Sequence, residues 1–263
     1  MVMSWLGNME KSKEKLLVLL RKYINIISND FNIDIKDFEI LEDKIIIEDT
    51  GSISLFVRDG KIYLPLLAYE VIDDFKKNPN YGTNKEHKCY DDGNLICNDN
   101  TFLDYINHVI VGGLDAEEYF AESLLHETLH LCGSKGCFAI REGMTELLTR
   151  ELALKYNLLT SGCGYYKEIE IANRLKSLFG ENVFYKIIFM NENELYEFLV
   201  ASLGLDAAEF YVLIRDKMEE EFYSKYYQYK FDNPYDKAFK YSEIDYKEVY
   251  DLIDLYESKI KKI

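Results

Sequence analysis

The feature that most constrains this chain is the lack of proline over more than half of its length, from Pro79 to Pro234. Proline breaks a helix wherever it stands in the interior, so this interval can be largely helical. Its breaks come instead from glycine- and serine-containing stretches, at 112–113, 133–136, 161–164 and Gly180. We therefore expect residues 113–263 to form a mainly α-helical part.

The N-terminal part, residues 1–112, shows a different pattern. Residues 9–30 carry apolar side chains at helical spacing, which predicts an amphipathic helix. The apolar runs FEIL, KIIIE, SISLFV and KIYL then alternate with turn residues, and Asp59-Gly60 is a strong hairpin signal. These runs predict a small antiparallel β-meander of three or four strands. The predicted fold class is α+β, with both parts forming one compact unit.

The last strand of this meander, KIYLP, ends at a proline, which suits the edge of a sheet. Extended peptides commonly bind by adding a strand to such an edge. The sequence therefore suggests this strand as the place where a peptide would lie.

Composition and charge exclude several classes of partner. The chain has 31 Lys and Arg against 47 Asp and Glu, a formal net charge of −16, which repels nucleic-acid phosphates and anionic membranes. The apolar run 16–20 is too short for a signal-peptide core or a membrane span. Five cysteines favour reduced thiols, and Cys132 and Cys137 receive no role. We expect a cytoplasmic protein with no nucleic-acid or membrane partner.

The stretch HETLH, residues 126–130, holds two of the four histidines. It lies in a segment that we predict to be a helix over about 116–132. Asp115 and Glu118 have the form of a capping box at its start, and Gly133 stands where a C-terminal glycine belongs.

Residues four apart lie one above the other on a helix, so His126 and His130 share a face, with Glu127 beside them. This H-E-x-x-H pattern is that of a catalytic zinc site. The histidines bind the metal, and the glutamate accepts a proton from the water that attacks a carbonyl. The alternative is that both histidines are ordinary core residues of a buried helix, with their ring nitrogens hydrogen-bonded.

Catalytic zinc usually takes three protein ligands. No histidine follows His130, and Gly136 occupies the third-histidine position of the extended motif H-E-x-x-H-x-x-G-x-x-H, which excludes a metzincin-type site. The first acidic candidate downstream is Glu142, in the helix-compatible stretch AIREGMTELLTRELALKY, and Glu146 follows on the same face. If this helix folds back, Glu142 can reach the ion while Glu146 holds the ring N–H of His126. A solvated glutamate pair is the alternative.

HETLH followed by REGMTE resembles the gluzincin branch of the zincin metallopeptidases over residues 126–146. The resemblance implies that Glu142 is the third ligand and that Glu146 is the partner of a ligand histidine. Arg141 stands where the group usually has asparagine, and the eleven residues 131–141 form a shorter connection than is typical. The short connection leaves Glu146 as a possible alternative ligand.

Gluzincins often supply a tyrosine or histidine, downstream of the ligands, that stabilises the charge developing on the carbonyl oxygen. By this resemblance Tyr165 and Tyr166 are the candidates, because no histidine follows the ligands. His87 and His108 are expected to be ordinary surface or core residues.

The sequence thus predicts a zinc-dependent metallopeptidase that hydrolyses a peptide or protein substrate. His126, His130 and Glu142 bind Zn²⁺, and Glu127 is the general base and proton shuttle.

Two alternatives stay open. One is a non-enzymatic or inactive zincin-like protein that acts as a partner-binding module, although a structural metal site has no need of Glu127. The other is a helical interaction module without metal. Residues 78–100, rich in Asn, Asp and Gly, predict a long surface loop that could gate the site. Substrate, cleavage mode and oligomeric state are not indicated.

Overall fold

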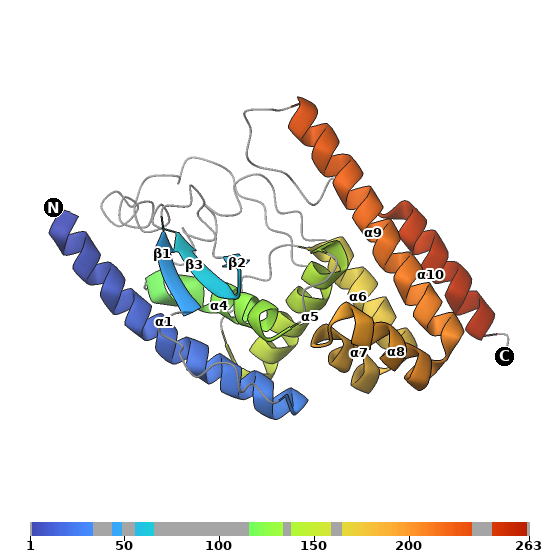
Figure 1. Cartoon of the computed structure of the whole chain (residues 1–263), viewed down its shortest axis with the longest axis horizontal. Helices are drawn as coiled ribbons and strands as arrows, with labels where there is room; N and C mark the ends of the chain where they lie inside the picture. The colour runs from blue at the N-terminus through green and yellow to red at the C-terminus, as the bar shows by residue number, and fades with distance from the viewer. Residues whose placement is uncertain are drawn as a thin grey trace. The chain divides into compact units, whose positions relative to one another are not determined.

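The structure is a computed structural model that describes residues 2–33, 44–48, 56–65, 116–133, 138–158, 165–232 and 244–261. In chain order the elements are α1 (Val2–Phe31), β1 (Ile45–Glu48), β2 (Phe56–Arg58), β3 (Lys61–Pro65), α4 (Ala116–Cys132), α5 (Phe138–Tyr156), α6 (Tyr166–Phe179), α7 (Glu181–Ile188), α8 (Glu192–Leu203), α9 (Leu205–Asp232) and α10 (Lys247–Ile260) (Figure 1).

The predicted α+β class is wrong, because the described residues are mainly helical. About 83% of them lie in helices, and the sheet has three strands. The apolar runs of the N-terminal part form strands of only 4, 3 and 5 residues, so the sheet is too small to define the class. The run FEIL, the glycines 112–113 and the stretch 78–100 lie outside the described residues.

The sheet has the order β1-β3-β2 and is mixed, which corrects the predicted antiparallel meander. β1 pairs with β3 in parallel, with Ile45 opposite Ile62, whereas β2 pairs with β3 antiparallel. β3 is therefore the central strand, and its predicted edge position is wrong. The predicted hairpin is confirmed, because Asp59 and Gly60 have positive φ angles of 53° and 70°, as a two-residue turn between twisted strands requires.

The chain divides into two compact units. The first comprises residues 1–132 and 149–163, and the second comprises residues 133–148 and 164–263. In the first unit α1 lies along α4, and α4 also contacts β2 and β3 (Figure 1). The buried residues of α1 recur at helical spacing and include Leu16, Leu20, Tyr23 and Ile27. The predicted amphipathic helix is confirmed, and α4 has the bounds predicted for the HETLH helix.

The C-terminal turn of α5 is fastened to α1 within this unit. The Asp30 carboxylate accepts hydrogen bonds from Lys155 Nζ at 2.8 Å and from Tyr156 OH at 2.6 Å. Asp30 raises the pKa of both donors through these bonds. Because the donors are exposed, these contacts orient the helix end more than they stabilise the fold.

The second unit is helical, and its helices α9 and α10 run antiparallel. Near one end the Phe210 and Tyr256 rings stack with their centroids 3.9 Å apart, and near the other Lys217 Nζ lies 3.2 Å from Glu248 Oε2. Val249 and Ile253 of α10 are buried. The predicted break at Gly180 is confirmed: its φ of 80° ends α6, and Gly204 ends α8 in the same way, with φ 93°.

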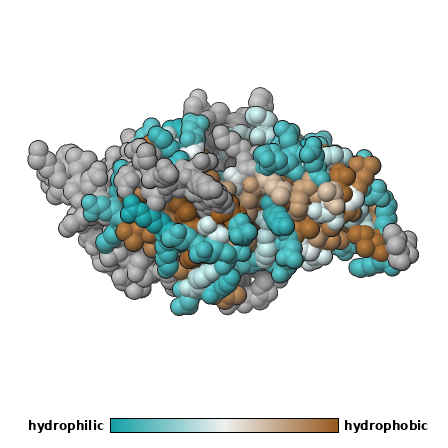
Figure 2. Space-filling model, turned by 60° about the horizontal axis from the view of Figure 1, so that its bottom comes forward, coloured by the Kyte–Doolittle hydropathy of each residue, from teal (hydrophilic) through white to brown (hydrophobic). Residues whose placement is uncertain are grey.

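In the part of the chain that the structure describes, no helix has the length and apolarity needed to cross a membrane. On the face drawn in Figure 2, hydrophilic side chains cover much of the coloured surface, with hydrophobic ones between them. Exposed large apolar side chains include Leu205, Leu213, Leu255 and Ile260. Single exposed apolar residues of this kind are normal on folded proteins.

The packing of α1 on α4 predicts unequal effects of two neighbouring substitutions. Leu16 is fully buried, so Leu16→Ala should lower the free energy of unfolding by about 2–5 kcal/mol. Val18 is 63% exposed on the same helix, and Val18→Ala should change it by at most about 0.5 kcal/mol. Urea unfolding followed by circular dichroism checks both. Equal stability of the two variants would contradict the assigned packing.

Candidate metal centre

Helix α4 brings the two histidines of HETLH together. His126 Nε2 and His130 Nε2 are 3.0 Å apart, and the rings meet edge to face with centroids 4.8 Å apart. The rest of the helix is held by burial of Leu124, Leu125 and Leu129. These buried leucines hold α4 in place. The helix backbone therefore directs the His126 and His130 side chains to the same side.

A carboxylate from α5 joins the two imidazoles. One ligand atom each from His126, His130 and Glu142 can be chosen so that all three lie within 4.8 Å of one another. His126 and Glu142 are buried, at 9% and 8% exposure, and His130 is half-buried. The structure therefore gathers the three residues that the sequence analysis assigned as ligands.

This donor set fits a zinc ion. Catalytic zinc is commonly bound by two histidines and one glutamate, with a fourth position left for water. Two nitrogens bound to zinc at 2.0–2.1 Å lie roughly 3 Å apart, which matches the separation of the two Nε2 atoms. A hydrogen bond between two imidazoles would have a similar length. The carboxylate is thus the feature that favours a metal over two histidines packed in a core.

Glu146 lies one turn after Glu142 on α5 and is buried, at 5% exposure. It is not a member of the three-residue group among the described residues, so the geometry favours Glu142 as the ligand. A buried carboxylate one turn beyond a ligand is suited to hold the ring N–H of a metal-bound histidine. That role of Glu146 stays a prediction.

Glu127 is the neighbour of His126 on α4 and is half-buried. A general base must reach both the nucleophile and the leaving group, and partial exposure allows this. Tyr165 and Tyr166 are also half-buried, at the start of α6, where Tyr165 has a left-handed φ of 53°. The assignment of either tyrosine as a donor to the carbonyl oxygen stays a prediction.

Glu168, which packs against α5 next to the ligand Glu142, could not be identified from the sequence. Gly143, next to Glu142, approaches α6 so closely that a Cβ atom there would lie 2.4 Å from the carbonyl oxygen of Glu168. The one available signal was a glycine inside a helical pattern, which often marks close packing. Nothing in the sequence identifies Glu168 as the partner, because this contact is not local.

One basic residue, Arg141, precedes the ligand Glu142 on α5. Burial lowers the pKa of Arg141, whereas Glu142 and Tyr211 raise it. Arg141 thus supplies a positive charge next to the ligand glutamate, in the place where the gluzincin pattern has a neutral asparagine.

Other candidate groups do not contribute to the centre. Cys132 is a free thiol at the end of α4, and burial raises its pKa to about 12. Among the described residues it is not a member of the three-residue group of His126, His130 and Glu142. His87, His108 and Cys137 lie outside the described residues.

No protein-family model, curated protein or solved structure matches the chain. The motif and the geometry of the three candidate ligands are therefore the basis for a proposed function.

The raised pKa of Cys132 predicts slow alkylation in the folded protein. At pH 8 a thiol with a pKa of about 12 is ionised in only ~1 molecule in 10⁴, and the thiolate is the reactive form. Labelling with iodoacetamide, followed by peptide mass spectrometry, should show Cys132 reacting far more slowly in the native than in the unfolded chain. Rapid labelling of native Cys132 at pH 8 would contradict the raised pKa of this half-buried thiol.

Proposed function

We propose that the protein is a zinc-dependent metallopeptidase of gluzincin type, with His126, His130 and Glu142 as the metal ligands. The observation that carries the proposal is the buried glutamate beside two histidines one helical turn apart. A buried carboxylate within 4.8 Å of two imidazoles completes the two-histidine, one-glutamate set that catalytic zinc commonly takes. A divalent cation compensates the cost of burying that carboxylate.

The residues around the ligands have separate roles in the proposed hydrolysis. Zinc bound there would polarise the peptide carbonyl and supply a water nucleophile that is readily deprotonated at neutral pH. Glu127 accepts the proton of the attacking water and then donates it to the amine nitrogen as the C–N bond breaks. Tyr165 or Tyr166 donates a hydrogen bond to the carbonyl oxygen as it gains charge.

Glu146 acts on the ligands and not on the substrate. Its buried carboxylate accepts the ring N–H of His126, which fixes the ring orientation and raises the basicity of the nitrogen that faces the metal.

The proposed substrate is a peptide or a protein. A net charge of −16 disfavours nucleic acid and anionic membranes as partners. The odd number of cysteines suits a cytoplasmic protein.

The proposal predicts that Glu127→Gln separates metal binding from turnover. The variant should keep the zinc content of the wild type, because Glu127 is not a ligand, and should lose at least about 10²-fold in kcat/KM, because general base catalysis contributes at least that much. A library of fluorogenic peptides, cleaved by zinc-loaded protein, measures the rate.

Two results would contradict this prediction. Equal cleavage by wild type and Glu127→Gln would remove Glu127 as the base, or show that the activity comes from a contaminant. Zinc-loaded wild type that cleaves no member of the library would favour the non-enzymatic alternative.

A further inference from the structure

Gly143 follows the ligand Glu142 inside helix α5, and the proposed mechanism gives it no role. It is buried, and it is not among the glycines with a positive φ angle, so its backbone conformation does not call for glycine. Glycine is unfavourable in the interior of a helix, because it loses more conformational freedom on folding than any other residue. A glycine in such a place often marks a close packing contact.

The contact at Gly143 is with the backbone of α6. A Cβ atom on residue 143 would lie 2.4 Å from the carbonyl oxygen of Glu168, 2.5 Å from its carbonyl carbon and 2.7 Å from its Cβ atom. Ordinary van der Waals contact begins at 3.4 Å, so α5 and α6 would have to separate by roughly 1 Å to admit a methyl group. No side-chain rotation relieves this clash, because the backbone fixes the positions of all three atoms.

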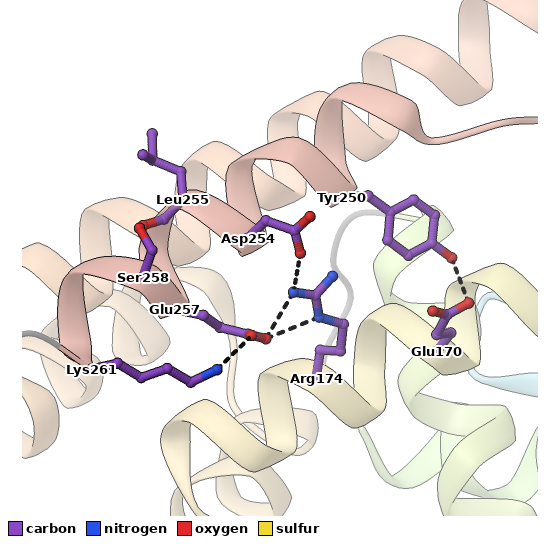
Figure 3. A network of polar contacts seen from close by, with 8 residues as sticks. All are labelled: Glu170, Arg174, Tyr250, Asp254, Leu255, Glu257, Ser258 and Lys261. Atoms are coloured by element: carbon purple, nitrogen blue, oxygen red, sulfur yellow. Dashed lines mark hydrogen bonds and ion pairs between the residues drawn. The ribbon is translucent and has the colours of Figure 1, made fainter.

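Helix α6 is in turn fastened to α10, as Figure 3 shows. The Tyr250 hydroxyl donates to Glu170 Oε2 at 3.0 Å. One turn further along α6, the Arg174 guanidinium donates to both Asp254 and Glu257. A single exposed ion pair contributes little, but this guanidinium bonds two carboxylates at once. These contacts resist a movement of α6 away from α5.

Two further observations show that α6 is held close to Glu168. Lys167 Nζ donates to the carbonyl oxygen of Ile244, in the segment before α10, at 2.6 Å. Ile171 and Ala172, within the next turn of α6, are fully buried. A larger side chain at position 143 would therefore displace the start of α5 as well as α6.

We infer that Gly143 is a positioning residue for the metal ligand Glu142. By admitting the α6 backbone into close contact, it makes α6 a support for the peptide that carries the ligand. Residues 142 and 143 share a peptide bond, so a displacement at Gly143 is passed directly to Glu142, whose side chain is buried. Metal–ligand distances are defined within ~0.2 Å, and even half of the separation that a methyl group requires exceeds this range. This inference rests on the proposed metal centre.

The test introduces the same methyl group at two glycines of the full-length chain. Gly143→Ala places it against α6. Gly180→Ala, the matched control, places it at the end of α6, where no described heavy atom lies within 4 Å but the φ of 80° strains any larger residue. Zinc affinity is measured by competition with a chromophoric chelator, and the visible spectrum of the Co²⁺-loaded protein reports the geometry at the metal. Thermal unfolding of the apo-proteins monitors the fold.

The expected result for Gly143→Ala is ~10-fold weaker zinc binding and a changed Co²⁺ spectrum, as for other changes that shift a metal ligand. Gly180→Ala should melt at a lower temperature than the wild type, because of its backbone strain. Its zinc affinity should stay within about twofold of the wild type, since Gly180 lies roughly 18 Å along α6 from Glu168.

If Gly143→Ala does not fold, a variant that loosens the support takes its place. Arg174→Met removes the ion pairs of α6 with α10, whereas its control, Lys217→Met, removes the ion pair of α9 with Glu248 of α10. Arg174→Met should bind zinc more weakly than Lys217→Met by more than about twofold and should alter the Co²⁺ spectrum. Equal affinities and spectra would then overturn the inference.

A folded Gly143→Ala with wild-type zinc affinity and Co²⁺ spectrum would overturn the inference, even with a lower melting temperature, because the contact would then be structural. Equal losses of affinity in Gly143→Ala and Gly180→Ala would also overturn it, since the loss would follow general destabilisation. Wild type that takes up no zinc would overturn the metal centre and the inference together. Wild type that binds zinc but cleaves no peptide would overturn the proposed peptidase function alone and leave the comparison of the glycines valid.

Discussion

The candidate site depends on one arrangement, a buried carboxylate from α5 beside two imidazoles from α4. A carboxylate loses much of its hydration at 8% exposure, and it stays ionised there only with compensation by positive charge or by hydrogen bonds. The two histidines stand one turn apart on a helix whose neighbouring residues are buried, so the backbone holds their Cα atoms on one face. Glu142 is similarly constrained, since Gly143 is in backbone contact with α6. The packing around each ligand thus involves no metal: α4 is packed within the first unit and the start of α5 within the second.

Much of this arrangement could be predicted from local sequence. The bounds of α4 agree with those expected from its terminal signals, and four-residue spacing was sufficient to place His126 and His130 on one face. The search for a third ligand led to Glu142 because histidine is absent downstream. Local patterns also located the hairpin at Asp59-Gly60, since its backbone conformation is set by these two residues.

Features that depend on residues far apart in the sequence could not be predicted. Alternation of side chains does not reveal strand direction, so β3 was placed at an edge of an antiparallel sheet when it is the centre of a mixed one. The predicted α+β class is wrong because the short apolar runs form only a three-stranded sheet, whereas most of the described residues lie in helices. Glu168 was missed for the same kind of reason: a glutamate in an amphipathic helix has no local mark of burial, and its contact with Gly143 exists only in the folded chain.

The central claim is that His126, His130 and Glu142 bind one zinc ion. The most direct test is elemental analysis of zinc per chain, in wild type purified without a histidine tag and in the variants Glu142→Gln and Glu146→Gln. We predict about one zinc in the wild type, nearly complete loss in Glu142→Gln and only weakened retention in Glu146→Gln. A folded wild type that contains no zinc and takes up none on dialysis would contradict the claim and leave HETLH as two histidines packed in a helical core.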